Sequence, residues 1–63
     1  MKNTAKLKLI LQLFNLSLEM DEEEILHFTL TDKRTGERKT FIDKSYSVVV
    51  QKGFVFMKKK MKE

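Results

Sequence analysis

The feature that most constrains this chain is the stretch LKLILQLFNLSLEM, residues 7–20, which concentrates large apolar side chains near its start. Apolar residues occupy the odd positions over 7–13 and the even positions over 14–20, and Ile10 is the one break in this alternation. Alternation is typical of a strand with one buried face, because successive side chains point to opposite sides. A shift of phase between the two halves is what a β-bulge produces. The pattern therefore predicts a bent strand over residues 6–20.

The same stretch also permits a helix, because Leu, Lys, Gln, Glu and Met are good helix formers. Two features count against the helix. The charges have the wrong sign for the helix macrodipole, with Lys6 and Lys8 at its start and the acidic residues 21–24 beyond its end. Its apolar arc would also be about 220° wide at about 100° per residue, more than a chain of this size can cover. A helix over residues 5–20, packed on a four-stranded antiparallel sheet, is the alternative α+β fold.

A hairpin is the clearest local signal in the sequence. Residues 25–31 alternate between apolar and polar, and residues 37–43 form the returning strand. Between them, Asp32 fits the opening of a type I turn, and Gly36 fits a position with positive φ. The acidic residues 21–24 are expected to be the turn that precedes this hairpin.

The C-terminal third of the sequence predicts two more strands. Residues 46–51 and 54–57 are rich in β-branched and aromatic residues, and Lys52-Gly53 between them predicts a tight reversal. Residues 1–5 are expected to be a frayed lead-in, and residues 58–63 a basic tail. The whole sequence is therefore expected to form one mainly β domain, a five-stranded antiparallel meander or barrel-like fold.

The small size of the chain predicts self-association. A domain of 63 residues buries little surface, and small domains often rely on disulfides, a metal or a partner subunit. The chain has no Cys and only one His, so we expect a homodimer. Two predicted strands are apolar on both faces, which calls for a second layer or a partner. The residues assigned to this contact are Val49, Phe54, Val55 and Met57.

The sequence contains no pattern that we assign to catalysis. There is no thiol nucleophile, and the only general base of histidine type is His27, on the expected polar face of a strand. With only two glycines, the chain cannot form a glycine-rich phosphate loop. The acidic run lacks the alternating ligands and central glycine of a calcium loop. We therefore expect a protein that is not an enzyme and has no cofactor and no metal.

The positive charge of the chain is compatible with an anionic partner, although many soluble proteins are equally basic. The net charge is +4 and the pI is about 9.5, which is compatible with contacts to DNA or RNA phosphates. In an up-and-down meander, the 32–36 loop and the Lys52-Gly53 turn fall at one end of the sheet, and the acidic turn falls at the other, beside the basic tail. The residues that this layout assigns to nucleic-acid binding are Lys33, Arg34, Arg38, Lys39 and Lys52.

The sequence therefore predicts a small non-enzymatic binding or regulatory module that contacts nucleic acid through a basic hairpin. The alternative is a protein-binding module that acts through an exposed sheet edge or an apolar strand face. No segment approaches the roughly 20 apolar residues needed to cross a bilayer, so no membrane partner is expected. The absence of cysteine is compatible with a reducing compartment, and we expect a cytoplasmic location.

Overall fold

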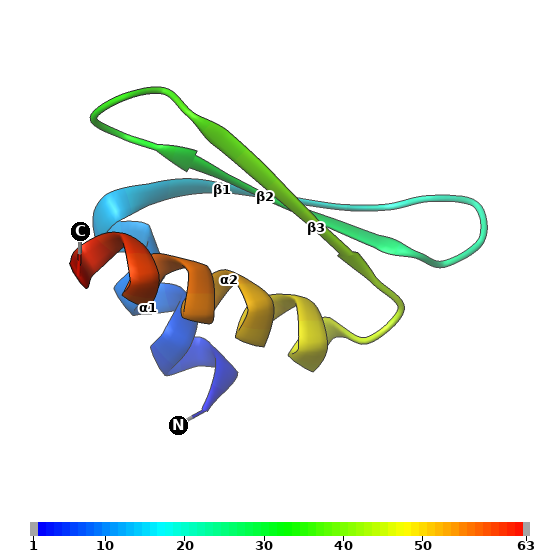
Figure 1. Cartoon of the computed structure of the whole chain (residues 1–63). Coiled ribbons are helices and arrows are strands. Elements are labelled where there is room, and N and C mark those ends of the chain that lie inside the picture. The colour runs from blue at the N-terminus through cyan, green and yellow to red at the C-terminus, as the bar shows by residue number, and fades with distance from the viewer. Residues whose placement is uncertain (1, 63) are drawn as a thin grey trace.

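The computed structural model describes residues 2–62, which form two helices and a three-stranded antiparallel sheet (Figure 1). In chain order the elements are α1 (Asn3–Leu13), β1 (Phe14–Met20), β2 (Leu26–Asp32), β3 (Arg38–Asp43) and α2 (Tyr46–Lys62). The fold is α+β, so the expected mainly β fold with five strands is wrong. The lead-in is helical from Asn3 onward, and Lys58 to Lys62 continue α2.

The alternative expectation, an N-terminal helix on antiparallel strands, has the right class but the wrong bounds. Helix α1 ends at Leu13, and residues 14–20 form β1. The sheet has three strands in the order β1-β2-β3, with each strand antiparallel to its neighbour. Both strands expected at residues 46–51 and 54–57 are missing because residues 46–62 form one continuous helix, and β1 supplies the third strand of the sheet.

The shift of phase in the N-terminal stretch marks the junction between a helix and a strand. Ile10 and Phe14, four positions apart across this junction, are both buried, at 0% and 2% exposure. The charges on α1 do not favour a helix, since its first turn has no acidic residue and its last turn no basic one. Such charge effects contribute only about 0.3–1 kcal/mol each. Burying one isoleucine side chain contributes about 1.5–3 kcal/mol, so packing prevails.

Helix α2 replaces the two expected C-terminal strands. Its buried residues, Val49, Val50, Gly53 and Met57, recur at intervals of three and four after the first pair and so share one face. Valine disfavours a helix by less than about 0.7 kcal/mol per residue, which is small beside the gain from burying it. The expected strand–turn–strand is therefore wrong, because one helical face buries what two separate strands would have left without cover.

The start of α2 is fixed by a side-chain cap. The backbone N–H of Val48 donates to Ser45 Oγ at 3.4 Å, and the N–H of Val49 donates to the Ser45 carbonyl at 3.1 Å. Asp43 Oδ1 in turn accepts the N–H of Ser45 at 2.9 Å. A serine before a helix satisfies donors that the first turn leaves unpaired. The turn expected at residues 43–45 is thus the N-terminal cap of a helix.

The 32–36 hairpin loop is confirmed. Asp32 Oδ1 accepts the backbone N–H of Arg34 at 2.7 Å and that of Thr35 at 3.3 Å. Gly36 has a φ of 79°, in the region that favours glycine, and its N–H donates to the Asp32 carbonyl at 2.9 Å. The carboxylate and the glycine have the roles that the sequence predicts for them.

The molecule has two layers, with both helices on one face of the sheet (Figure 1). The core lies between these layers and consists of Ile10, Phe14, Phe28, Leu30, Val49, Val50 and Met57. The opposite face of the sheet carries polar side chains, including Thr29 and Thr40, whose hydroxyl oxygens are 3.0 Å apart. Within residues 2–62, neither helix combines the length and the apolar character that crossing a bilayer requires.

Candidate nucleic-acid interface

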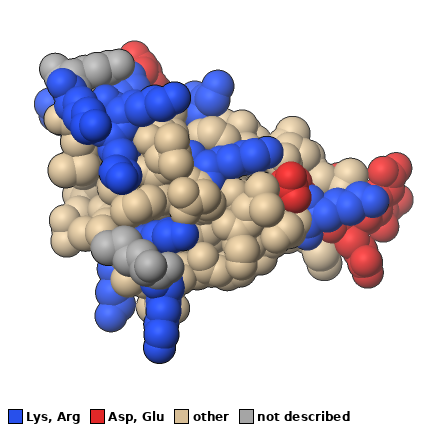
Figure 2. All heavy atoms as spheres, turned by 60° about the horizontal axis from the view of Figure 1, so that its bottom comes forward, with Lys and Arg blue, Asp and Glu red and all other residues tan. Residues whose placement is uncertain are grey.

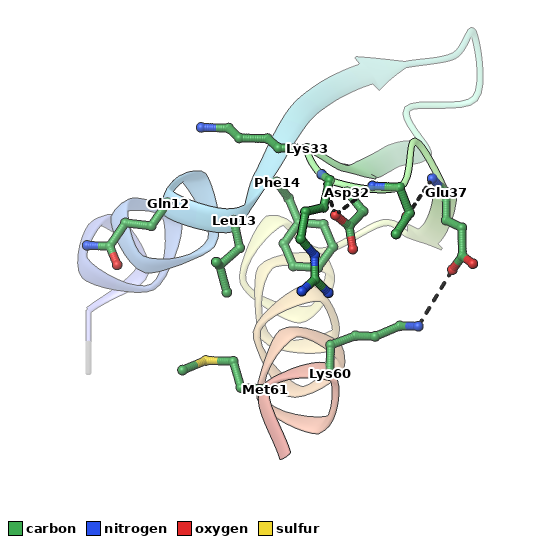
Figure 3. Close-up of a pocket in the computed structure, with 10 residues that line it drawn as sticks. Gln12, Leu13, Phe14, Asp32, Lys33, Glu37, Lys60 and Met61 are labelled. Carbon is green, nitrogen blue, oxygen red and sulfur yellow. Dashed lines mark hydrogen bonds and ion pairs between the residues drawn. The ribbon is translucent and has the colours of Figure 1, made fainter. Parts of the chain in front are cut away.

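The β2–β3 hairpin and the last turns of α2, which lie far apart in the sequence, meet at one end of the molecule. Lys60 Nζ is 3.6 Å from Glu37 Oε2, so an ion pair joins the two segments. Between them and the end of α1 is an open hollow of about 650 Å³ (Figure 3). A second hollow of about 140 Å³, lined by Arg38, Lys39 and Lys60, adjoins it.

The hollow has apolar walls and a charged rim. Leu13 from the end of α1 and Met61 from the end of α2 point into it (Figure 3), and they are 43% and 65% exposed. Phe14 closes its floor but is 2% exposed, so its ring offers no face for stacking. The hollow therefore lacks the aromatic platform that single-strand binders use.

This end of the molecule carries more than half of the 13 Lys and Arg residues of the chain. We call it the basic end, and its cations are Lys33, Arg34, Arg38, Lys39, Lys58, Lys59, Lys60 and Lys62. Figure 2 shows Lys and Arg side chains gathered toward one end of the face in view and most acidic side chains at the other. The sequence assigned the first four of these cations to a single patch, and they do lie together.

Several cations of the basic end are held in place by their surroundings. Lys33 Nζ donates to the carbonyl of Leu11 at 2.7 Å, at the end of α1. Lys58 Nζ is 5.5 Å from the ring centre of Phe54, and Lys60 Nζ is 5.9 Å from that of Phe56. Lysine stems can cover apolar surface in this way while the ammonium stays in water. The charges are therefore presented from positions defined by packing.

Asp32 is the acidic group nearest the centre of the hairpin loop. Backbone N–H donation, chiefly from Arg34 and also from Thr35, holds the pKa of Asp32 below its ordinary value, and the positive charges of Arg34 and Lys60 act in the same direction. Asp32 is therefore ionised at neutral pH and shapes the loop. Glu37 pairs with Lys60, and the basic end keeps a large excess of positive charge.

Lys52 does not belong to the basic end. Its Nζ is 3.7 Å from Asp43 Oδ2, and Asp43 pairs with Leu26 at the end of the sheet next to the acidic turn. The N–H bond from Ser45 is the main cause that lowers the pKa of Asp43, and the charge of Lys52 adds to it. The expected layout put Lys52 with the hairpin and the tail with the acidic turn. Both placements are wrong because α2 runs the length of the sheet instead of folding back at Gly53.

The acidic turn is organised by Asp21. Its Oδ1 accepts the N–H groups of Glu23 at 2.9 Å and Ile25 at 3.0 Å, and its Oδ2 accepts His27 Nε2–H at 3.0 Å. The bond from His27 is the main cause that holds the pKa of Asp21 below its ordinary value. Glu24 has a φ of 63° within this turn. His27 thus contacts a carboxylate at the surface, on the polar face where the sequence placed it.

The four residues assigned to self-association are dispersed. Val49 and Met57 are 0% and 3% exposed, inside the core, so a folded protomer presents neither of them to a partner. Phe54 is half-buried, with Lys6 Nζ 5.9 Å and Lys58 Nζ 5.5 Å from its ring centre. Only Val55 is exposed, at 39%.

From the sequence, the C-terminal lysines are expected to contribute little to the nucleic-acid contact. They were expected to form a tail after the last strand, whereas α2 carries them next to the hairpin. The available signal was the spacing of Val49, Gly53 and Met57 at intervals of four, which favours a helix running into the lysines. Ser45, a favoured capping residue, stood just before it.

Among residues 2–62, no three His, Asp or Glu side chains gather closely enough to hold a metal ion. Comparisons with protein-family models, with curated proteins and with solved structures found no match. The function of this chain is therefore inferred from its own residues.

Proposed function

We propose that this chain is a small binding module whose basic end contacts the phosphate backbone of a nucleic acid. The observation that carries the proposal is the meeting of the hairpin with the end of α2, joined by the pair of Lys60 with Glu37. It combines cations from two distant segments into one surface. Each Lys or Arg that neutralises a phosphate releases counterions, so such a surface binds with an affinity that depends steeply on salt.

The basic end has no exposed phenylalanine ring, and Tyr46, 42% exposed, lies at the opposite end of α2, which supports backbone contact over base recognition. The five Phe residues are buried or half-buried, and single-strand binders stack bases on exposed rings. The proposed contact is thus electrostatic, tolerant of sequence, and applicable to DNA or RNA. Such binding supplies affinity through phosphates and specifies no base sequence.

The test is fluorescence anisotropy with labelled single- and double-stranded DNA and RNA over a series of salt concentrations. One variant replaces Arg34, Lys39 and Lys59 by Gln, which removes three exposed cations of the basic end. Its log–log salt slope should be shallower by about 2–3, since each phosphate contact contributes about 0.7–0.9. Circular dichroism should show the same fold as the wild type.

The matched control replaces Lys2, Lys8 and Lys44 by Gln, which changes the net charge equally but leaves the basic end intact. The control should retain most of the affinity and the salt slope. Equal loss in both triple variants would mean that only net charge matters. A wild-type protein that does not bind at low salt would reject the function itself.

A protein-binding role through an exposed sheet edge is the second candidate. It is favoured by β1, which lies at the edge of the sheet, and by its exposed side chains Leu18 and Met20. This role predicts a specific partner and no steep dependence of nucleic-acid affinity on salt. A cytoplasmic location is compatible with a chain without cysteine and stays a prediction.

A further inference from the structure

The two edges of the sheet differ in how they are protected. Edge strands with unpaired backbone groups recruit further strands unless charges, bulges or covering elements prevent it. Strand β3, at one edge, carries Arg38 and Lys39. Strand β1, FNLSLEM, at the other edge, carries one charged residue, Glu19, and no proline, and within residues 2–62 its one strand partner is β2.

The direction of the free backbone groups of β1 follows from its pairing with β2. The Lys33 N–H donates to the Leu13 carbonyl at 3.1 Å, and the Asp21 N–H donates to the Ile25 carbonyl at 3.0 Å, one bond at each end of this ladder. In antiparallel pairs, residues that exchange backbone bonds alternate with residues that do not. The backbone N–H and C=O groups of the odd-numbered residues in this stretch therefore face β2. The backbone groups of Leu16, Leu18 and Met20 point to the free edge.

The uncovered apolar side chains of β1 stand at the same even positions. Leu18 pairs across the ladder with Phe28, and Met20 with Leu26, so both lie on the face that the helices cover. Yet Leu18 is 46% exposed and Met20 63% exposed, whereas Phe28 is 1% exposed. The helices therefore cover the first half of β1 and leave its second half open. Leu11 and Leu13, at the other end of β1, are similarly exposed, at 45% and 43%.

We infer that β1 pairs antiparallel with β1 of a second copy of this chain, about a two-fold axis at Ser17. In this register Leu16 exchanges backbone bonds with Leu18 of the partner subunit, because both residues point to the free edge. Met20 of each chain approaches the partner's Phe14 and the exposed end of its α1. The two-fold pairing thus covers the open half of β1 with apolar surface and continues the sheet across the axis.

Charge complementarity selects this antiparallel arrangement. The acidic residues 21–24 follow one end of β1, and Lys33, bonded to α1 through the Leu11 carbonyl, lies at the other. An antiparallel pair puts the acidic turn of each chain toward the partner's Lys33. A parallel pair would put like charges together. Because the two contacting strands are identical, the contact is self-complementary and closes as a dimer without extending to a fibre.

The register makes a sharp prediction for cross-linking in a chain that has no native cysteine. At the axis, Ser17 faces Ser17 of the partner subunit in a pair without backbone bonds, where Cα atoms are about 4.5 Å apart. That spacing fits a disulfide. The Ser17→Cys variant should therefore form a covalent dimer rapidly on mild oxidation. The side chain lies on the polar face and is exposed, so the substitution spares the core.

The matched control is Asn15→Cys, also exposed on the polar face of β1. In the inferred register Asn15 faces Glu19 of the partner subunit, which puts the two introduced thiols about 13 Å apart at about 3.3 Å per residue. Asn15→Cys alone should not cross-link. A mixture of Asn15→Cys with Glu19→Cys should give the mixed dimer. If Ser17→Cys forms dimers no faster than Asn15→Cys, the register is wrong.

Sedimentation equilibrium, without nucleic acid, tests the contact itself. The wild type should reach the dimer mass within the micromolar to millimolar range. Leu18→Lys, which places a charge in the contact, should be monomeric, with an unchanged circular dichroism spectrum because the position is already exposed. Ile42→Lys lies on the other edge strand at a position that is 53% exposed. This variant should reach the same dimer mass as the wild type. A monomeric wild type at every concentration, a dimeric Leu18→Lys, or an equally dissociated Ile42→Lys overturns the inference.

Discussion

Replacing Gly53 by alanine would test how closely α2 approaches the sheet. Gly53 lies on the buried face of α2, opposite Phe28 and Leu30 of β2. A Cβ at this position would be 2.7 Å from Cε2 and 3.3 Å from Cδ2 of Phe28, and 3.4 Å from Cδ1 of Leu30. Carbon atoms pack best at about 3.5–4.0 Å, so the ring or the helix must move. The ring is 1% exposed and has little space to move into.

Two opposing effects set the size of the change. Alanine is favoured over glycine inside a helix by about 1 kcal/mol, which would stabilise the protein. Overpacking a close-packed core costs about 1–3 kcal/mol, and a contact of 2.7 Å with a buried ring belongs in the upper part of that range. We expect Gly53→Ala to be less stable by about 1–2 kcal/mol. For a domain of this size, Tm should fall by about 4–16 °C.

The assay is thermal and urea unfolding followed by far-UV circular dichroism. An exposed position of the same helix separates propensity from packing: Val55, 39% exposed, is changed to Gly and to Ala in two further variants. There alanine should be the more stable of the two by about 1 kcal/mol. At position 53 the order should be reversed.

A double-mutant cycle identifies the atoms involved. Phe28→Leu removes the part of the ring that the new methyl group meets, so the Gly53→Ala, Phe28→Leu protein should be more stable than the sum of the single changes predicts. Contacting residues commonly show coupling of about 0.5–3 kcal/mol. A rise in Tm for Gly53→Ala, or additive effects of the two changes, would contradict the close contact between Gly53 and the Phe28 ring.

Two further perturbations probe the N-terminal helix and the acidic turn. Ile10→Ala should lose about 2–5 kcal/mol, a large part of the stability of a small domain, because Ile10 is fully buried; the exposed Lys8→Ala should change the urea midpoint little, and similar losses in both would contradict the role of Ile10. His27→Ala should raise the pKa of Asp21 toward its ordinary value of about 3.9, which NMR titration can follow, while the pKa of Asp43 stays unchanged. Because the lowered pKa of Asp21 contributes stability above this ordinary value and loses it as pH falls through the folded value, the stability difference between wild type and His27→Ala should shrink in acid. An unchanged Asp21 titration would exclude His27 as its main partner.

The sequence predicts the central hairpin well because its determinants are local. Asp32 accepts hydrogen bonds from the N–H groups of Arg34 and Thr35, two and three residues away. Gly36 occupies the one position of the loop that has a positive φ. Alternation over residues 25–31 also predicts β2 correctly, since one face of this strand meets the core and the other meets water. Each of these signals can be recognised without knowing what packs against the hairpin.

The helices could not be predicted in the same way, because their cause is tertiary. In the first stretch, both α1 and β1 alternate between apolar and polar residues apart from Ile10, and the helix packs Ile10, with Leu7 and Leu9, against the core. In the last stretch, valines and a Lys-Gly pair have strand and turn preferences worth less than about 1 kcal/mol each. The absence of a side chain at Gly53 lets α2 approach Phe28 closely, and no local sequence pattern reveals this contact.

The candidate site shows the same division between local and distant information. Clustering of Lys33, Arg34, Arg38 and Lys39 follows from the hairpin and could be predicted from sequence. The partners of Lys52 and Lys60 depend on the path of α2, which was expected to fold back at Gly53. Running the helix along the sheet exchanges the two ends, so Lys60 reaches Glu37 and Lys52 reaches Asp43. The wrong path expected for residues 46–62 thus placed Lys52 and the C-terminal lysines at the wrong ends of the sheet.

The excess of apolar strand positions in the sequence has two different explanations in the structure. For Val49, Val50 and Met57 the explanation is internal, since they form the face of α2 that covers the sheet. For Leu18 and Met20 no cover exists within the described protomer, because α1 ends at Leu13 and both helices leave the second half of β1 open. An alternating strand with one polar face ordinarily has its other face buried. The unsatisfied part of the pattern is therefore an argument for a surface that a second chain completes, and it depends on the free edge of β1 alone, whatever the basic end binds.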